Sequence, residues 1–345
     1  MLHDVPNPAL PIAGIIMQGT NMKKLIVALA LAATMGSNGS APAQVYPSRP
    51  VTMVVGAPAG GPTDTIARVV AEHMRSSLGQ SILIENNSAA ASSVAAGRVA
   101  RAAPDGYTIS VGHWGSHVVN GVIYALPYDV LNDFEPIALI ASTPQLIVSR
   151  NAVPANDLKS LVGWLKANPD KASQGTGGVG SAAHVGGVFF QASTATRFLF
   201  VPYRGAAPAM QDLLAGQIDL MFDQATNSLP QIRAGKIRAY AVAAKNRLSA
   251  APEIPTVDEA GLPGFYVAVW HGLWAPKSTP KDVIAKLNGA VVDALADSAV
   301  SSRLADLGQD IFPREQQTPE ALAAYQKAEI EKWWPIIKAA NIKVE

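Results

Sequence analysis

The sequence contains no cysteine in its 345 residues. This absence excludes disulfide bonds, thiolate metal sites and a cysteine nucleophile. Charged residues are also scarce, at 15% of the chain against about 25% in an average domain. Hydrophobic residues make up 49%, a composition that favours a globular chain with a large core over a disordered one. We find no internal repeat, and the length suits two domains of ordinary size better than one.

No apolar run long enough to span a membrane follows Gln44. Upstream, "KKLIVALALAATM" places two lysines before a short apolar segment, and "APA" then matches a small-residue cleavage signal. We expect residues 1–43 to form a signal peptide region, with translation starting at Met22 and cleavage near Ala43. This signal would export the chain from the cytoplasm. An N-terminal membrane anchor is the alternative interpretation.

Removing the predicted signal region lowers the formal net charge from +1 to zero. A neutral chain has no electrostatic basis for binding nucleic acid or an anionic membrane, so neither partner is expected. Nucleotide cofactors are scarce outside the cytoplasm, and we therefore expect no cofactor. The mature protein is expected to be a monomer.

Apolar, β-rich segments alternate with helix-period segments along the mature chain. Strands are expected at 50–57, 81–86 and 107–113, with helical patterns between them. The alternation restarts after a strand at 136–150, and a return strand is expected at 268–276. This order indicates parallel sheets whose strands are connected by crossover helices.

Two such units predict an α/β fold with two lobes, each a mostly parallel sheet flanked by helices, and a cleft between them. Lobe 1 is expected to comprise residues 44–144 and 266–345, and lobe 2 residues 145–265. Two amphipathic helices, at about 280–296 and 318–339, are expected in the tail.

The segment "PAGGPTD" at 58–64 follows the first expected strand and opens a helix. Glycines let the backbone approach a ligand, and the N–H groups of a helix N-terminus favour an anion. The segment has neither the lysine of a P-loop nor G-x-G-x-x-G spacing. A carboxylate therefore suits it better than a polyphosphate. The candidate ligand-binding residues here are Ala59, Gly60, Gly61, Pro62, Thr63 and Asp64.

A second glycine segment, "GTGGVGSAAH" at 175–184, repeats the device in the second unit. Two such loops facing one cleft would hold an anionic ligand between two helix N-termini. Either loop by itself is equally well explained as a tight strand–helix turn. The candidate ligand-binding residues of this loop are Thr176, Gly177, Gly178, Val179, Gly180, Ser181 and His184.

The stretch "GHWGSH" ends the third expected strand, in a position to face the cleft. His113 and His117 have the spacing of helical metal ligands, but Gly115 lies between them and no acidic partner completes the pattern. We therefore expect no metal site and retain His113 as a ligand-binding candidate. Trp114 is a candidate for stacking on an aromatic ligand, with core packing as the equally weighted alternative.

Further side chains are candidates for contact with the ligand. In the return strand, Trp270 or the neighbouring His271 would cover a ligand ring or simply pack in the core, and Trp270 is the residue selected for the site. Arg204 would pair with a second carboxylate of the ligand, although solvent exposure is the commoner outcome for arginine. Catalysis has little support, because G-x-S-x-G is absent and Ser181 and His184 lie on one helix without triad geometry. We expect no enzyme activity, and a secreted hydrolase is the disfavoured alternative.

Several long stretches together carry a family resemblance. "VTMVVGAPAGGPTDTIARVVAEHM", "VPYRGAAPAMQDLLAGQIDLMFDQ", "PEIPTVDEAGLPGF" and "GLWAPKSTP" resemble the receptors of tripartite tricarboxylate transporters, also called Bug proteins. The resemblance extends from about Tyr46 to the C-terminus. It implies a periplasmic solute-binding protein with a Venus-flytrap fold that closes on a small carboxylate and delivers it to a membrane permease.

The resemblance also implies that the two glycine loops grip the ligand carboxylate, partly through ordered water. Asp223, after the strand "IDLMF", would face the pocket and meet an amine, hydroxyl or water. An aromatic acid of the phthalate type is one candidate ligand. A ligand-sensing role beside a membrane kinase is the alternative function. The sequence departs from the family pattern at Pro62, where a third glycine is common, and at 86–93.

Overall fold

The computed structural model describes residues 46–342, so the predicted signal peptide region lies outside the described residues. From Pro47 onward the chain forms one compact unit. Within the described residues, no helix has the length and hydropathy needed to cross a bilayer. The strands are β1 (Val51–Val55), β2 (Ile82–Asn86), β3 (Thr108–His113), β4 (Phe134–Arg150), β5 (Ser173–Thr176), β6 (Leu199–Pro202), β7 (Leu220–Gln224), β8 (Ile237–Val242), β9 (Ala268–Pro276) and β10 (Asp310–Ile311).

The helices alternate with these strands, as the sequence pattern predicts. They are α2 (Pro62–Leu78), α3 (Ser93–Ala100), α4 (Asn120–Ile123), α5 (Leu158–Ala167), α6 (Ala182–Thr194), α7 (Ala206–Leu214), α8 (Ala225–Arg233), α9 (Lys281–Ala296), α10 (Ser298–Asp306) and α11 (Pro319–Ala339). The described residues also form the short turns η1 (Ala89–Ser92), η2 (Gly115–Val119) and η3 (Arg314–Gln316).

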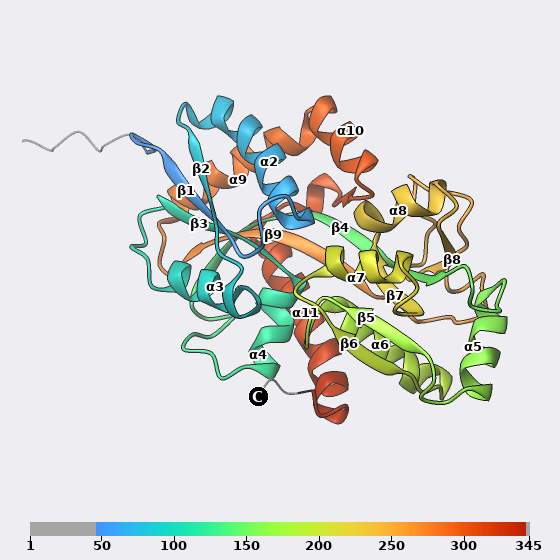
Figure 1. Cartoon of the computed structure of the whole chain (residues 1–345). Coiled ribbons are helices and arrows are strands. Elements are labelled where there is room, and N and C mark those ends of the chain that lie inside the picture. The colour runs from blue at the N-terminus through green and yellow to red at the C-terminus, as the bar shows by residue number, and fades with distance from the viewer. Residues whose placement is uncertain (1–45, 343–345) are drawn as a thin grey trace, which may run out of the picture. The chain divides into compact units, whose positions relative to one another are not determined.

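The strands form one continuous sheet in the order β2-β1-β3-β9-β4-β7-β5-β6, with β8 and β10 also paired to β4 (Figure 1). Pairing is parallel among β2, β1 and β3 and again among β7, β5 and β6, whereas β9 and β4 run antiparallel to their neighbours. We call β1–β3 with β9 the first half and β5–β7 the second half, each with its helices. The α/β class predicted from the sequence is confirmed.

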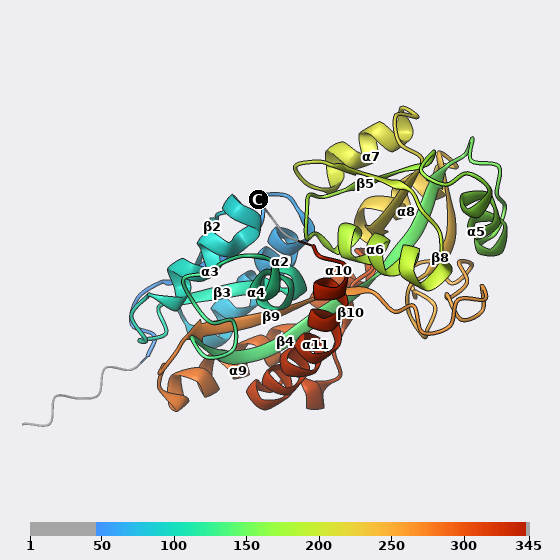
Figure 2. The same ribbon diagram turned by 90° about the horizontal axis from the view of Figure 1, so that it is seen from below.

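The long strand β4 belongs to both halves, as Figure 2 shows. Its residues 134–144 pair with β9, and from Gln145 onward it pairs with β7 and β8. Pro144 stands at this change of partners, and proline has no N–H to donate to a ladder. The lobe boundaries given by the sequence remain a prediction. We would place the hinge between the lobes at this change of strand partners.

A second connection crosses beside the first. The N–H of Gln145 donates to the carbonyl of Val267 (2.9 Å), and the carbonyl of Gln145 accepts from Ala243 (2.8 Å). Val267 in turn donates to Ala243 (3.0 Å). Three chain segments therefore meet at Gln145 through backbone hydrogen bonds, which gives the connection between halves a defined geometry.

Helices cover both faces of the sheet. In the first half α2 and α9 lie together on one face, while α3, α4 and α11 lie on the other (Figure 1). The apolar positions of α2, Ile66, Val70 and Met74, recur at helical spacing and are fully buried. Gly79 ends α2 in the left-handed conformation, with its N–H on the carbonyl of Arg75. The helix predicted from this pattern is confirmed.

Several elements are not anticipated by the sequence pattern, among them η2, α8 and α10. The π-helical turn η2 follows β3 directly, and a single turn of this kind leaves no periodic signature. Helix α8 contains Pro230, which masks its pattern. Helix α10 begins immediately after α9, because the Asp297 side chain accepts hydrogen bonds from the N–H groups of Ala299 and Val300.

Two facing glycines make room for an aromatic stack in the first half. Gly112 of β3 pairs with Gly272 of β9. The buried rings of His117 and Trp274 occupy the adjoining space, stacked with centroids 3.8 Å apart. A Cβ added at Gly112 would lie 2.2 Å from His117 Cε1 and 2.9 Å from Trp274 Cζ3. Glycine is therefore required here for close packing.

We expect Gly112→Ala to lower the free energy of unfolding by about 1–3 kcal/mol, because overpacking forces buried rings out of their positions. Gly163→Ala is the matched control, since a Cβ at this exposed helical position meets nothing. The control should instead gain roughly 0.5–1 kcal/mol. Urea unfolding followed by circular dichroism measures both. Equal effects of the two substitutions would contradict the packing argument.

Candidate functional site

The first glycine loop connects β1 to α2. Gly60 has φ 79°, a conformation that favours glycine, and Gly61 is the extended N-cap of the helix. Pro62 takes the first helical position, where its missing N–H costs no hydrogen bond. No side chain caps this helix start, so the N–H groups of Thr63 and Asp64 lie outside the helical ladder. Those two N–H groups are the donors that the loop offers.

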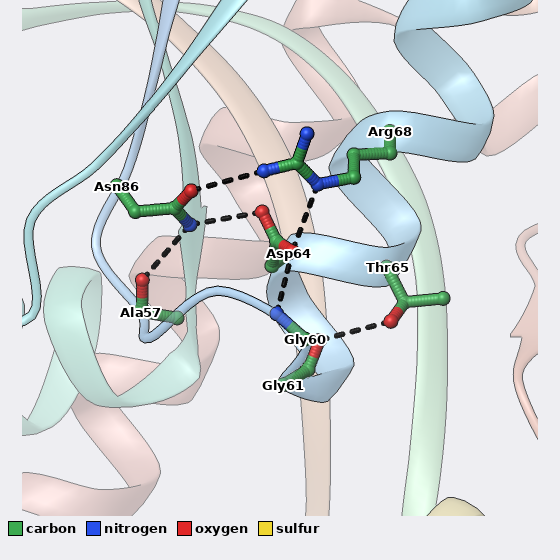
Figure 3. A network of polar contacts seen from close by, with 7 residues as sticks. All are labelled: Ala57, Gly60, Gly61, Asp64, Thr65, Arg68 and Asn86. Carbon is green, nitrogen blue, oxygen red and sulfur yellow. Dashed lines mark hydrogen bonds and ion pairs between the residues drawn. The ribbon is translucent and has the colours of Figure 1, made fainter.

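The side chain of Asp64 holds the loop together (Figure 3). Its carboxylate is 2% exposed and accepts hydrogen bonds from Gly60 N (2.7 Å), Asn86 Nδ2 (2.9 Å) and Arg68 Nε (2.9 Å). Asn86 also donates to the carbonyl of Ala57 (3.0 Å). The carboxylate is therefore committed to the loop's own backbone and to Arg68, and Asn86 is a supporting residue that sequence reasoning missed.

The ionisation of Asp64 follows from these contacts. Burial raises the pKa of its carboxyl. The hydrogen bonds from Arg68, Gly60 and Asn86, together with the charge of Arg68, lower the pKa by more than burial raises it, so the net shift is downward. The pKa of Arg68 is correspondingly raised by the hydrogen bond to Asp64. The two charges compensate each other, so the first loop offers neutral donors rather than a free cation.

A histidine of β9 connects the first loop to the crossing strands. Thr63 Oγ1 lies 3.1 Å from His271 Nε2, and both side chains are buried. His271 pairs with His113 of β3, and the two rings lie 6.2 Å apart. Sequence reasoning selected the neighbouring Trp270 for the site. Adjacent residues of a strand point to opposite faces, so the alternation of β9 is the signal that could have favoured His271.

Both of these histidines are neutral. His113 Nδ1 accepts from the N–H of Gly115 (3.0 Å), which places the ring proton on Nε2, 3.4 Å from Ser92 Oγ. Ser92 in turn donates to the carbonyl of Gly56 in the first loop. Burial lowers the pKa of His113 to about 4 and that of His271 to about 3. They can orient the loop by hydrogen bonds, but they bring no positive charge.

The second glycine loop connects β5 to α6. Ser181 is the N-cap, and its Oγ accepts from the N–H of His184 (3.3 Å). His184 Nδ1 accepts from the N–H of Gly180 (3.0 Å), which leaves the proton of the neutral ring on Nε2. Burial lowers the pKa of His184. Ser181 therefore caps α6, and His184 folds back onto the loop.

The second loop touches the first half of the sheet through a glycine. Gly178 and Gly180 have φ of 114° and 76°, which favour glycine. A Cβ added at Gly180 would lie 2.1 Å from Ile123 Cδ1 of α4. Thr176 is buried, and Val179 remains 40% exposed. The structure therefore brings the second loop against a helix of the first half.

The start of α7 adjoins the same loop. A Cβ at Gly177 would lie 3.6 Å from the carbonyl carbon of Gly205, the N-cap of α7, which has no side-chain cap. Arg204 immediately precedes this N-cap and is exposed. Tyr203 is held by a hydrogen bond from its hydroxyl to Asp212 (2.6 Å). A second uncapped helix N-terminus thus lies next to the second loop.

Asp223 lies at the end of β7 and is 3% exposed. Its Oδ2 accepts hydrogen bonds from Ser228 Oγ (2.7 Å) and Asn227 Nδ2 (2.8 Å) of α8. Burial raises the pKa of this carboxyl to about 6, although the hydrogen bonds oppose the shift. The oxygen Oδ2 serves α8, so a direct contact with a ligand would have to involve the other carboxyl oxygen.

The two candidate tryptophans are core residues. Trp114 and Trp270 are both fully buried. Trp114 packs edge-on against Trp333 (5.2 Å between centroids), and the indole N–H of Trp270 donates to Glu329 (3.2 Å). Core packing, the alternative considered for both residues, is the arrangement observed. Their positions give no support to stacking on an aromatic ligand.

His117 lies in the π-turn η2 that sequence reasoning missed. Its Nδ1 lies 2.9 Å from Ser116 Oγ, and its ring stacks on Trp274, so it contributes to packing. Among residues 46–342 no cluster of three histidine, cysteine, aspartate or glutamate side chains has the arrangement of a metal site.

A groove of about 220 Å³ lies elsewhere, between α10, residues 308–311 and residues 248–250. It includes none of the predicted site residues. We therefore base the candidate site on the donors of the two loops and not on this groove.

Replacing Asp64 tests whether its carboxylate holds the first loop. We expect Asp64→Asn to lower the free energy of unfolding at pH 7 by about 1–3 kcal/mol, because hydrogen bonds to a charged group are lost. Since the folded-state pKa is lowered, this contribution is present above the unfolded-state pKa and disappears as the pH falls through the folded-state pKa. Urea unfolding from pH 7 downward measures the difference from the unsubstituted chain.

The exposed ion pair between Glu85 and Arg98 supplies the control. Glu85→Gln should change stability by less than about 1 kcal/mol at any of these pH values. If Asp64→Asn unfolds at the same urea concentration as the unsubstituted chain at pH 7, the carboxylate does not hold the loop.

Comparisons with known proteins agree with this architecture. The family model described as tripartite tricarboxylate transporter family receptor matches residues 66–342. The periplasmic binding protein BugD is 42% identical, with a TM-score of 0.79, and the match covers 87% of this chain and 100% of BugD. MatC from Rhodopseudomonas palustris, solved with bound malate, is 41% identical with a TM-score of 0.78, over 85% of this chain and 100% of MatC. Another R. palustris protein, solved with adipate, is 32% identical with a TM-score of 0.80, over 87% of this chain and 100% of its own. The chain belongs to the tripartite tricarboxylate transporter receptor family, as the sequence motifs predict.

Proposed function

We propose that this protein is a periplasmic receptor that captures a small carboxylate between residues 59–64 and 176–184. It would then present the ligand to the membrane subunits of a tripartite tricarboxylate transporter. The observation that carries the proposal is the approach of the two halves at Gly180 and Ile123. This contact brings a glycine loop and helix N-terminus of the second half against the first half, which carries the other glycine loop.

The donors of these loops suit a carboxylate. Uncapped N–H groups at the start of α2 and α7 carry partial positive charge from the helix dipole. The nearby histidines are neutral, and Arg68 is already paired with Asp64. A single carboxylate can be neutralised by such donors without a full counter-charge. A polyphosphate normally needs lysine or arginine as well.

We infer that the ligand is a dicarboxylate. The first loop offers one set of donors, and the second loop with the start of α7 offers another set. Arg204, exposed beside α7, is a candidate partner for the second carboxylate. The relatives solved with malate and adipate hold acids of this class. The buried tryptophans leave an aromatic acid without a stacking partner among the residues considered for it.

Closure of the two halves supplies the binding mechanism. Strand β4 is hydrogen-bonded in both halves, and Val267, just before β9, is hydrogen-bonded to Gln145 at their junction. These two segments would act as the hinge. A ligand that contacts both loops only in the closed arrangement shifts the population toward that arrangement. The closed form would be the one that the membrane subunits recognise. The predicted export signal is consistent with a periplasmic location for the receptor.

A thermal-shift panel tests the ligand class. The chain from Gln44 onward, unfolded and refolded to remove any bound solute, should melt at a higher temperature with L-malate or adipate. At a ligand concentration of 100 times the Kd, binding raises the free energy of unfolding by about 2.7 kcal/mol. Propionate, with one carboxylate, and phthalate, with an aromatic ring, are the comparison acids. A shift with propionate alone, or with none of the acids, would refute the dicarboxylate proposal.

Gly180→Ala tests the closure mechanism. The added methyl would meet Ile123, so we expect the Kd for the dicarboxylate found in the panel to rise about tenfold or more. Gly235→Ala introduces the same left-handed strain where a Cβ meets nothing, and this control should leave the Kd unchanged. Ile123→Ala in the Gly180→Ala chain should restore part of the affinity by making room. Isothermal titration calorimetry measures all three, and an unchanged Kd in Gly180→Ala would contradict the closure mechanism.

A further inference from the structure

One carboxylate lies among tryptophans beside the crossing strands. Glu329 of α11 accepts hydrogen bonds on a single oxygen, Oε2, from Trp270 Nε1 of β9 (3.2 Å) and from Trp333 Nε1 of its own helix (3.2 Å). The indole N–H of Trp114 lies near enough to lower the pKa of Glu329 but makes no hydrogen bond of normal geometry. We call these four residues the Glu329 cluster.

The charged surroundings of Glu329 are few. Burial raises the pKa of its carboxyl, and the Lys332 charge and the indole N–H groups offset part of that shift. Lys332 itself donates to the carbonyl of Tyr266 (3.2 Å), in the segment that leads into β9. Tyr325, whose ring packs on Trp270 (5.3 Å), has a pKa raised by burial and by the charge of Glu329. Placing a carboxylate in such apolar surroundings costs free energy unless it is hydrogen-bonded, and here both hydrogen bonds come from indoles.

From Trp270 the contacts lead to the first glycine loop. Trp270 and His271 are neighbours in β9 and point to opposite faces of the strand. His271 Nε2 lies 3.1 Å from Thr63 Oγ1, at the start of α2. The position of Trp270 therefore influences the position of the side chain that orients Thr63.

From Trp333 the contacts lead to the second glycine loop. The ring of Trp333 packs edge-on against Phe189 of α6 (5.7 Å), which stacks on Phe265 (5.1 Å). Helix α6 begins directly after Ser181, the last residue of the second loop. Glu329 thus lies on a continuous chain of contacts between the two loops, and it belongs to neither.

We propose that Glu329 is a positioning residue that sets the balance between the open and closed arrangements of the two halves. Its two hydrogen bonds hold Trp270 and Trp333 in one relative arrangement, and through them β9 and α6. This inference rests on the proposed function, because it assumes that the halves close on a ligand. Glu329 would not touch the ligand, so it changes the affinity for every ligand by one common factor and leaves selectivity unchanged.

Because the chain has no cysteine, a pair of introduced cysteines can be spin-labelled without background. Lys166→Cys in α5 and Lys286→Cys in α9 place one label at an exposed position in each half. Pulsed electron–electron double resonance then measures the distribution of distances between the two spin labels, one in each half, without any ligand. Three further substitutions are compared in this labelled chain: Glu329→Leu, Glu329→Gln and, as the control, Glu331→Gln.

Glu329→Leu removes both hydrogen bonds, and we expect it to change the ratio of the long-distance and short-distance populations about fivefold or more. Glu329→Gln keeps one oxygen that can accept both indole N–H groups, so its distribution should stay close to that of the unsubstituted chain. Glu331→Gln changes an exposed glutamate on the same helix and should have no effect. Circular dichroism confirms that each variant is folded, and Glu329→Gln provides a second comparison if Glu329→Leu does not fold.

An unchanged distribution in folded Glu329→Leu overturns the proposal, and so does an equal change in Glu329→Gln and Glu329→Leu. If Glu329→Leu does not fold, a clear change in Glu329→Gln overturns it. Titration with L-malate and adipate adds a separate arm, in which Glu329→Leu should change both Kd values by the same factor. If neither acid binds the unsubstituted chain, the dicarboxylate proposal fails, whereas the ligand-free distances still decide the role of Glu329.

Discussion

A single 17-residue strand, β4, is hydrogen-bonded in both halves of the sheet, and the positions of both glycine loops depend on it. At Pro144 the strand loses β9 as its partner, and at Gln145 it acquires β7. The parallel strands that end in the two loops are arranged outward from this shared strand. A displacement at the crossing would therefore move the loops relative to each other while each half keeps its own hydrogen bonds and core.

The electrostatics of the site follow from compensation inside the protein. Arg68 is paired with Asp64, and burial keeps His113 and His271 neutral. What remains for a ligand within the two loops is a set of N–H groups whose partial charges are fixed by the backbone. Donors of this kind need no reorganisation when the ligand arrives, and a carboxylate matches their strength. Under the proposed function, specificity for one acid would depend on the distance between the loops, which the crossing strands set.

Much of the local structure was predictable because local physics decides it. The spacing of Ile66, Val70 and Met74 specifies a helix with one buried face, and the glycine and hydroxyl residues before α6 specify a turn and a cap. The predictions made for single side chains were less secure, because a strand places neighbours on opposite faces. Trp270 therefore lies in the core, and His271 meets the first loop.

The sequence by itself determined the α/β class, the two glycine loops, the absence of thiol chemistry and the family. Each of these depends on residues that are near one another in the chain, or on long ordered motifs. Only the tertiary structure decided that Asn86 and Gly60 donate hydrogen bonds to Asp64 and that Ile123 packs against Gly180. It also decided that Glu329 accepts hydrogen bonds from the indoles of Trp270 and Trp333. These contacts join segments that the sheet order brings together from distant parts of the chain. The hydrogen bonds between Gly60 and Asp64 and between Trp333 and Glu329 are local in the sequence. The other contacts join residues far apart in the chain, and no local sequence pattern encodes them.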